Sequence, residues 1–378
     1  MQSAIIVSQQ VLVMFLMIGC GLFFNRRRLI SESAAREFCS LLLNLALPCV
    51  IIQSFLRPMR PEYLSGFAMA IGIAFAMHLF AVAAAQLLIR PRADEGYRVE
   101  RFSAVYSNCA FMAFPLLRAT VGEDGVFYAT AFVVFFILFQ WVHGILVLGG
   151  SINPRKLLYN PCILSVAIGL LIFFTQCPIP APLASAIGML SAVNSPLSMV
   201  ITGVFLAGLP LSGLRNIRLV TTAAIRLLVM PLAAIAVICA LGMPNWIETG
   251  PVVCTSLVIG FACPTAVAAI LLSAHLRKEV LYASEQIAMS TLFSLVTLPL
   301  VAGIAVAVFW AVPPKPRRRR TRRSARPDEG FWRRAFQSIG SFPALPVMPP
   351  VYRRHFCPMK PFAHLPAHCL GPCCFSRH

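Results

Sequence analysis

Four prolines interrupt apolar stretches of this chain, and polar or small side chains surround them. Pro48 and Pro115 lie in the first half at almost the same spacing as Pro196 and Pro264 in the second. A proline inside a helix removes a backbone donor and clashes with the preceding turn, so it creates a helix end within apolar surroundings. The amino-terminal end of a helix carries partial positive charge and open N–H groups, which suit a carboxylate. The pattern therefore predicts an anion-binding site rather than covalent chemistry.

Side chains that offer hydrogen bonds stand close to each of these prolines. We predict that the substrate site is formed by Asn108, Pro115, Asn194, Ser195, Pro264 and Thr265. Beside it, we expect the cavity to be lined by Asn44, Pro48 and Pro196, with the Asn44 amide capping the carbonyl that Pro48 leaves unpaired. The alternative interpretation is that the prolines only kink packed helices and that the asparagines hydrogen-bond between helices.

The composition requires a lipid environment for these elements. Hydrophobic residues make up 58% of the 378 residues and charged residues 12%, well outside the range of soluble domains. Ten apolar runs are long enough to cross a bilayer, near 4–24, 36–56, 64–89, 103–120, 126–149, 160–177, 183–209, 219–241, 250–274 and 281–311. We therefore predict an all-α polytopic membrane protein in which the fourth and ninth helices are broken. The net charge of +19 sits in short loops and at the carboxyl end, which argues against a nucleic-acid partner.

The basic residues predict an orientation. They concentrate after odd-numbered helices, at Arg26, Arg27, Arg28, Arg36, Arg90, Arg92, Arg98, Arg101, Arg155, Lys156, Arg215, Arg218, Arg277 and Lys278. Loops after even-numbered helices hold only Arg57, Arg60 and Arg118. Cytoplasmic loops are enriched in Lys and Arg, so the amino terminus is predicted to lie outside. Because each half has an odd number of helices, residues 1–150 and 151–312 are predicted to form two inverted five-helix repeats.

Residues 313–378 have a different composition, rich in Pro, Arg, Cys and His without apolar periodicity. We predict a disordered tail, which an accidental reading frame would also explain; the alternative is an anchor that binds anionic lipid. Its cysteines and histidines match no zinc-finger spacing, so no metal site is predicted.

Three segments resemble one known family. Residues 107–116, Ser-Asn-Cys-Ala-Phe-Met-Ala-Phe-Pro-Leu, are similar to the Ser-Asn-x-Gly-Phe-x-Gly-Phe-Pro-Leu signature of the auxin efflux carrier family, although alanines replace both glycines. Asn160-Pro161 and residues 291–300 also match that family, and the resemblance extends over about residues 5–310.

The resemblance implies a particular architecture and class of substrate. Members of this family include plant auxin exporters and bacterial malonate and malate permeases. The family fold has two inverted five-helix repeats whose fourth and ninth helices cross at proline. It also implies anionic organic substrates, elevator-like movement and frequent dimerisation. The short linker between the halves favours the bacterial permease type.

Few ionisable residues lie inside the predicted spans, where a charge is costly. Glu285 and His78 are the candidates for proton coupling; their alternative roles are an interfacial carboxylate and a packed hydrogen-bonding side chain. Arg226 either pairs with a substrate carboxylate or extends to the membrane interface. No bound cofactor is predicted. The expected coupling ion is a proton, with sodium bound by freed carbonyls as the alternative.

The sequence thus predicts a proton-coupled secondary carrier of small organic anions, such as malonate, malate or auxin-like carboxylates, in the bacterial cytoplasmic membrane. No motif of a nucleotide-driven pump or an enzyme is recognisable in the sequence. A channel or a membrane sensor built on the same helices is the alternative.

Overall fold

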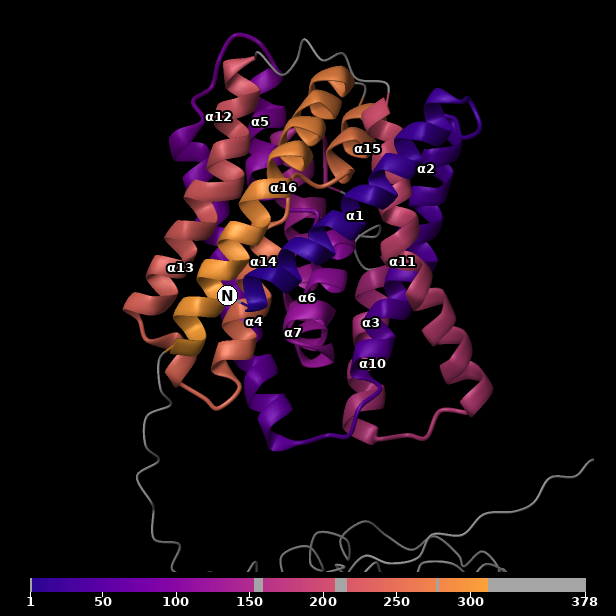
Figure 1. The fold of residues 1–378 in the computed structure, drawn as a ribbon, viewed down its shortest axis with the longest axis vertical. Helices are drawn as coiled ribbons and strands as arrows, with labels where there is room; N and C mark the ends of the chain where they lie inside the picture. Colours follow the sequence, from indigo (N-terminus) through magenta and orange to yellow (C-terminus); the bar gives the residue numbers. More distant parts are fainter. Residues whose placement is uncertain (1, 153–158, 208–215, 277–278, 312–378) are drawn as a thin grey trace, which may run out of the picture. The chain divides into compact units, whose positions relative to one another are not determined.

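The chain folds into a bundle of helices (Figure 1). A computed structural model describes residues 2–152, 159–207, 216–276 and 279–311. Within these ranges the only strand-like feature is one isolated bridge, and seven helices are long and apolar enough to cross a membrane. The predicted tail, 313–378, lies outside the described residues, as do the basic residues Arg155, Lys156, Arg215, Arg277 and Lys278.

The seven long spans are of two kinds. Four are single helices: α1 (Gln2–Arg26), α4 (Pro61–Leu88), α11 (Ala181–Ala207) and α16 (Val280–Ala311). Three spans contain a π-helical turn between two α-helical parts. The first consists of α2 (Glu32–Leu41), η1 (Leu42–Ala46) and α3 (Leu47–Phe55), and the second of α7 (Glu123–Phe139), η3 (Gln140–Gly144) and α8 (Ile145–Val147). The third consists of α12 (Ile217–Ala224), η5 (Ile225–Val229) and α13 (Met230–Ala240). The shorter elements are α5 (Gly96–Val105), η2 (Cys109–Ala113), α6 (Phe114–Thr120), α10 (Pro161–Thr175), η6 (Met243–Asn245), α14 (Gly250–Ala262) and α15 (Ala268–His275).

The outer surface of the bundle is apolar. Leu87, Ile217 and Val296 are 78%, 72% and 71% exposed, and many other large aliphatic side chains also point outward. A water-soluble protein rarely exposes so much contiguous apolar surface, whereas hydrocarbon chains solvate it well. The long helices and their exposed faces together define an integral, multi-pass membrane protein.

The helices form two packed groups. The α11 group consists of α1, α2, η1, α3, α10 and α11, which pack mainly against one another. The α14 group consists of the elements from α4 to α8 and from α12 to α16, centred on α14. Phe55 of α3 and Phe127 of α7 join the two groups through an edge-to-face contact of 5.5 Å between ring centroids. The substrate-site residues predicted from the sequence are distributed over both groups.

Two glycines bring α1 and α11 into close contact. A Cβ atom at Gly21 would lie 1.9 Å from the Val200 carbonyl oxygen, and one at Gly203 would lie 2.0 Å from the Ile18 carbonyl oxygen. Small residues at helix crossings allow this approach, which is a common means of association in membranes. The contact holds the α11 group together.

Most of the prolines within the spans do not break their helices, contrary to the prediction for Pro48, Pro115 and Pro196. Pro48, Pro115 and Pro231 each occupy the second position of a helix that follows a π-turn, and none interrupts its helix. A π-turn bonds each N–H to the carbonyl five residues earlier, so the carbonyl with which a proline ring would clash is displaced. Pro196 lies inside the continuous helix α11. The expectation that Pro48 and Pro196 break their helices is therefore wrong.

Candidate functional site

Two helices are interrupted at the centre of the α14 group. The first stops at the end of α5 and resumes with η2 and α6, and the second stops at the end of α14 and resumes with α15. The interrupted segments run antiparallel and form the isolated bridge between Ser107 and Thr265. Figure 1 shows α6 and α14 close together in the middle of the bundle. The predicted crossing of two broken helices is therefore present in the structure.

Backbone hydrogen bonds hold this crossing. The Asn108 N–H donates to the Pro264 carbonyl at 2.7 Å, and the Ala266 N–H donates to the Tyr106 carbonyl at 3.0 Å. An interrupted backbone within a membrane must find partners inside the protein, and here each broken segment supplies partners to the other.

The position of the first break corrects the prediction. The interruption lies at residues 106–108, whereas Pro115 lies in α6, after the π-turn η2. Pro264 by contrast lies in the interruption itself, between α14 and α15. Pro115 therefore does not mark a half-helix end, because the π-turn accommodates its ring within a continuing helix.

Polar side chains satisfy further backbone groups at the crossing. Ser107 Oγ donates to the Gly260 carbonyl at 2.9 Å, and Thr265 Oγ1 donates to the Ser103 carbonyl at 3.3 Å. The Thr265 N–H donates to Ser290 Oγ at 3.1 Å. Thr265, predicted as a binding residue, thus has both of its hydrogen-bond donors engaged within the protein.

The carboxyl-terminal ends of α5 and α14 converge on Arg226 of η5. This side chain is 0% exposed, and its guanidinium donates to four carbonyl oxygens, those of Ala104 (3.1 Å), Cys263 (3.2 Å), Val105 (3.5 Å) and Phe261. The guanidinium also lies over the Phe261 ring, 5.0 Å from its centroid. Arg226 therefore does not extend to a membrane interface.

The amino-terminal ends of η2 and α15 retain open donors. Within the described residues, the N–H groups of Cys109, Ala110, Val267 and Ala268 donate to no backbone carbonyl. Helix amino termini carry about half a positive charge each, and their N–H groups bind anions. The two broken helices thus direct two positive ends to one region.

A cavity of about 370 Å³ adjoins these two amino-terminal ends. The broken helices contribute Asn108, Ala110, Phe111, Ala266, Val267 and Ala268 to its wall. The opposite wall comes from α2, η1 and α10 of the α11 group, so the cavity lies between the two groups.

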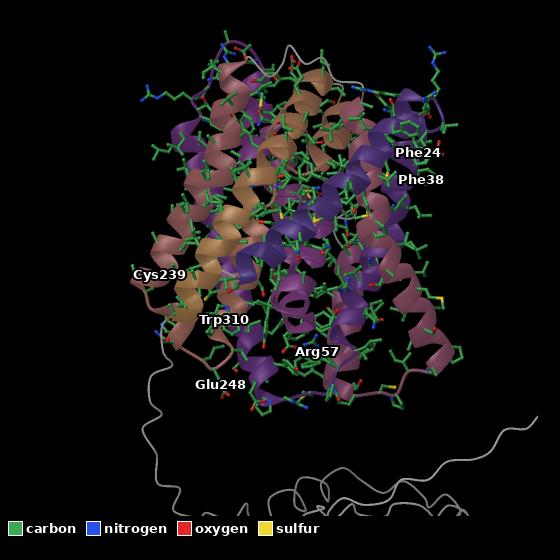
Figure 2. The ribbon with its side chains drawn as sticks, in the orientation of Figure 1. Phe24, Phe38, Arg57, Cys239, Glu248 and Trp310 are labelled. Atoms are coloured by element: carbon green, nitrogen blue, oxygen red, sulfur yellow. The ribbon has the colours of Figure 1, made fainter. Side chains whose placement is uncertain are left out.

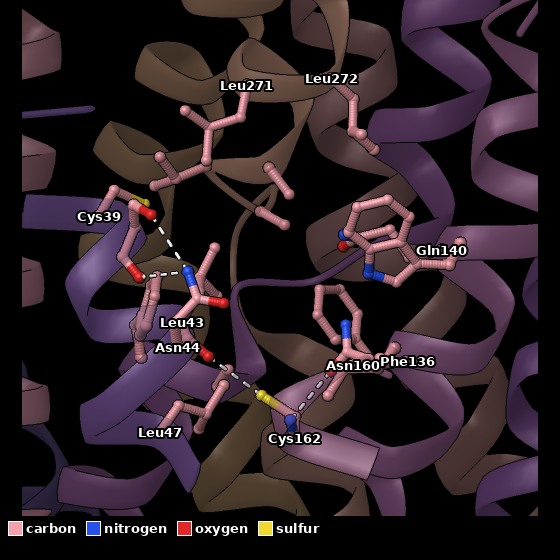
Figure 3. A pocket seen from close by; sticks show the side chains of 18 of the residues that line it. Cys39, Leu43, Asn44, Leu47, Phe136, Gln140, Asn160, Cys162, Leu271 and Leu272 are labelled. Carbon is pink, nitrogen blue, oxygen red and sulfur yellow. Dashed lines mark hydrogen bonds between the residues drawn. The ribbon is translucent and has the colours of Figure 1, made fainter. Parts of the chain in front are cut away.

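The remaining lining combines apolar and polar side chains. Asn44, Gln140 and Asn160 bring side-chain amides, and Phe136 brings an aromatic ring (Figure 3). Trp141 supplies a second aromatic ring, and Arg36 and His275 place basic groups on the wall. A small molecule with an anionic end and an apolar body fits such a lining.

Two carbonyl groups that prolines leave without a backbone donor accept hydrogen bonds from side chains; Figure 3 draws one of these donors, Cys162. Pro115 cannot donate to the Ala110 carbonyl, which instead accepts from Asn194 Nδ2 at 3.1 Å. Pro48 cannot donate to the Leu43 carbonyl, which accepts from Cys162 Sγ at 3.3 Å. In both cases, a helix of the second half of the chain satisfies a carbonyl that a proline of the first half leaves open.

The predicted role of Asn44 differs accordingly. Its amide donates to the Ser40 carbonyl at 2.8 Å and not to a carbonyl freed by Pro48. Of the residues predicted for the site, Asn44 and Asn108 line this cavity. The others are not among its lining residues: Pro48, Pro115, Asn194, Ser195, Pro196, Pro264 and Thr265.

The two residues predicted to couple protons lie away from the cavity lining. His78 is buried in α4, where its Nδ1 is 2.7 Å from the Ala74 carbonyl oxygen and its ring packs 4.5 Å from that of Phe132. Glu285 is half-buried in α16.

The sequence analysis missed a different buried carboxylate. Glu100 of α5 forms an ion pair with Arg92 and accepts from Tyr282 Oη at 2.8 Å. Near it, Arg218 at the start of α12 donates at 3.0 Å to Asp94, which lies outside the spans between α4 and α5, and this hydrogen bond lowers the pKa of the Asp94 carboxyl. Arg92 is near Glu100 in sequence, but Tyr282 is remote from it along the chain, so the sequence did not indicate that Glu100 is buried between these two side chains.

A second cavity, of about 480 Å³, lies at the other end of the interface between the groups. There, Arg57 at the end of α3 donates to the Asp124 carboxylate at 2.7 Å and to the Glu123 carbonyl at 3.0 Å. The Arg57 guanidinium also stacks over the Phe127 ring at 4.4 Å. Figure 2 labels Arg57 at the opposite end of the bundle from Phe38, a residue of α2. Other residues of α2, among them Cys39 and Ser40, line the first cavity.

An apolar helical bundle with two crossed, interrupted helices beside a cavity defines a membrane transport protein. The sequence agrees, because a family model described as "Membrane transport protein" matches residues 6–151 and 145–302. The chain therefore belongs to this family, the auxin efflux carrier family. No curated protein sequence matches the chain.

Proposed function

We propose that this protein is a secondary carrier of small organic anions and that the substrate carboxylate binds where η2 and α15 begin. The observation that carries the proposal is that the N–H groups of Ala110, Val267 and Ala268, which line the cavity between the helix groups, donate to no backbone carbonyl among the described residues. Two helix ends at one point supply close to one full positive charge in a low-dielectric setting.

The lining supports a choice of substrates. The cavity volume of about 370 Å³ falls at the small end of ligand pockets, which typically measure about 300–1,000 Å³. Asn108 adds a side-chain amide next to the open N–H groups, and Arg36 and His275 offer positive charge for a second carboxylate. We propose dicarboxylates such as malonate and malate first, and auxin-like monocarboxylates second, with the aromatic ring against Phe136 and Trp141.

The mechanism we propose is alternating access by relative movement of the two groups. The antiparallel crossing supports two inverted five-helix repeats, since corresponding helices of inverted repeats run in opposite directions. The first cavity has Arg36 and His275 in its wall, and it adjoins the end of the bundle where many of the basic residues occur. We propose that this end is cytoplasmic, that the amino terminus is outside, and that the described state is open inward in a bacterial inner membrane.

Transport into proteoliposomes tests this function. Purified full-length protein would be given labelled malonate, malate and indole-3-acetate under an imposed proton gradient. We expect saturable uptake of at least one anion, accelerated when the same anion is preloaded inside. A flux that never saturates would identify a channel instead, and the absence of binding and transport for all three anions would overturn the proposed substrate class.

A further inference from the structure

A buried arginine occupies the side of the crossing opposite the open N–H groups. Arg226 is fully buried, and among the described residues no Asp or Glu side chain forms an ion pair with it. A buried charge without compensation is costly, so the surrounding structure must supply the counter-charge.

The counter-charge comes from two helix ends. Arg226 donates to Ala104 and Val105 at the end of α5, and to Phe261 and Cys263 at the end of α14. Each carboxyl-terminal helix end carries about half a negative charge, so the two ends together balance one guanidinium group. The match in charge explains how an arginine is accommodated here without an acidic partner.

The same set of acceptors has another potential occupant. In carriers with interrupted helices, backbone carbonyls and carboxyl-terminal helix ends are the groups that coordinate a coupling cation. At this crossing the guanidinium already occupies four such oxygens with directed N–H donors. A metal cation would have to displace a side chain that is covalently attached and packed on the Phe261 ring.

We propose that Arg226 is a tethered cation that takes the place of a coupling sodium ion, so that anion transport by this chain does not depend on sodium. The transport part of this inference rests on the proposed function. A resident cation cannot dissociate during the cycle, so its charge does not link substrate affinity to the external cation concentration. The driving force is then the substrate gradient itself or a proton.

The first experiment uses the intact protein and needs no substrate. Thermal unfolding of the purified full-length chain in detergent would be compared in sodium chloride and in choline chloride at equal ionic strength. A site that binds sodium in the folded state would raise Tm in sodium, by mass action. We expect equal Tm values; a sodium-specific increase in the parent protein would overturn the proposal.

The second experiment removes the guanidinium group from the set of carbonyl oxygens. Arg226→Ala leaves the carbonyl set without its cation, so we expect a fall in Tm of more than about 5 °C, since each unsatisfied buried acceptor is costly. Adding sodium, or guanidinium below unfolding concentrations, should recover part of that fall in the variant only. Arg218→Ala is the matched control, because Arg218 lies on the same span but is exposed and pairs with Asp94.

Uptake provides an independent measurement. The parent protein should take up malonate or malate in sodium and in choline at rates equal within about twofold, and Arg226→Lys should retain more uptake than Arg226→Ala. Sodium-dependent uptake by the parent would overturn the proposal, as would an Arg226→Ala variant that folds and gains no response to either cation. If Arg226→Ala does not fold, the comparison of salts in the parent decides. A parent that transports none of these anions but unfolds equally in both salts would refute the proposed function and leave the assignment of Arg226 intact.

Discussion

The two broken helices reach the same geometry from different sequences. The second breaks at Pro264, between α14 and α15, whereas the first breaks at residues 106–108 and carries its proline further along, inside α6. Hydrogen bonding between the two segments explains the difference. Once Pro264 keeps its own segment out of a helix, the Pro264 carbonyl accepts from the Asn108 N–H and the Ala266 N–H donates to the Tyr106 carbonyl. One proline is sufficient for two interruptions, because the open segment provides hydrogen-bond partners for an extended backbone across the crossing.

The breaks also differ in what they bring to the cavity. At its break the first helix contributes an amide side chain, Asn108, whereas the second contributes Ala266, Val267 and Ala268, which offer only backbone polar groups, and brings a basic side chain, His275, only at its far end. Binding of the first carboxylate should therefore depend on a side chain of the first helix and on the backbone conformation of the second.

The largest effect expected from this comparison is that of Pro264→Ala. Restoring an N–H group and helix propensity at this position favours a continuous helix from α14 to α15, which removes the acceptor for Asn108. We expect initial uptake of malonate or malate to fall at least about 100-fold, because the binding geometry itself is lost. Pro115→Ala should change uptake by less than about threefold, since Pro115 is accommodated within a helix. Equal losses in the two variants would contradict the assignment of the breaks.

The next largest loss of uptake is expected from replacing Asn108, the polar side chain that the first helix supplies at its break. Asn108→Ala removes one hydrogen-bond donor to the carboxylate, and a hydrogen bond to a charged group is worth about 1.5–3 kcal/mol, so uptake should fall at least about tenfold. Two controls flank this variant: Cys109→Ala, its buried neighbour, and Val267→Ala, its cavity-lining counterpart on the second helix. Both should remain within about twofold of the parent in initial uptake rate. A similar loss in Val267→Ala would show that the two helices contribute alike.

The sequence predicted the crossing better than it predicted its details. Interrupted apolar runs and matched prolines indicate where helices change, because the loss of a donor is a local property of proline. Whether a proline produces a break or a π-turn depends on partners remote in sequence, as with Pro115 and the Asn194 amide that bonds the Ala110 carbonyl. Arg226 was recognisable as a costly charge in an apolar run, but its acceptors are backbone carbonyls, which leave no signature in side-chain types.

A smaller effect is expected where the second half of the chain supports the first broken helix. Asn194→Ala leaves the Ala110 carbonyl without its donor in a buried position, so stability should fall by about 1–3 kcal/mol. Thermal unfolding of the purified variant measures this loss. Ser195→Ala is the control: its side chain is half-buried and outside the cavity lining, and its unfolding free energy should change by less than about 0.5 kcal/mol. An unchanged Tm in Asn194→Ala would mean that the freed carbonyl finds another donor.

The smallest change is expected from an ion pair at the far end of the first broken helix. Because the two broken helices run in opposite directions, α15 leads to His275 at the first cavity, whereas α6 leads to the second cavity, where Arg57 of the α11 group pairs with Asp124 of the α14 group. Movement of the groups must break this pair, which therefore favours the described state. Asp124 is about half exposed, and ion pairs of this kind contribute up to about 1 kcal/mol, so Asp124→Asn should shift the conformational ratio by no more than about fivefold.

Thiol labelling measures that shift. Ser191 is buried beside the second cavity, so Ser191→Cys reports opening of this end through its rate of reaction with a maleimide, in a background where Cys20, Cys177, Cys239, Cys357, Cys369, Cys373 and Cys374 are changed to Ser. Adding Asp124→Asn should raise the labelling rate. Glu123→Gln is the matched control, because Glu123 pairs with Arg118 within the α14 group and that pair need not break when the groups move. An equal increase in both variants would mean that local loosening, and not separation of the groups, exposes residue 191.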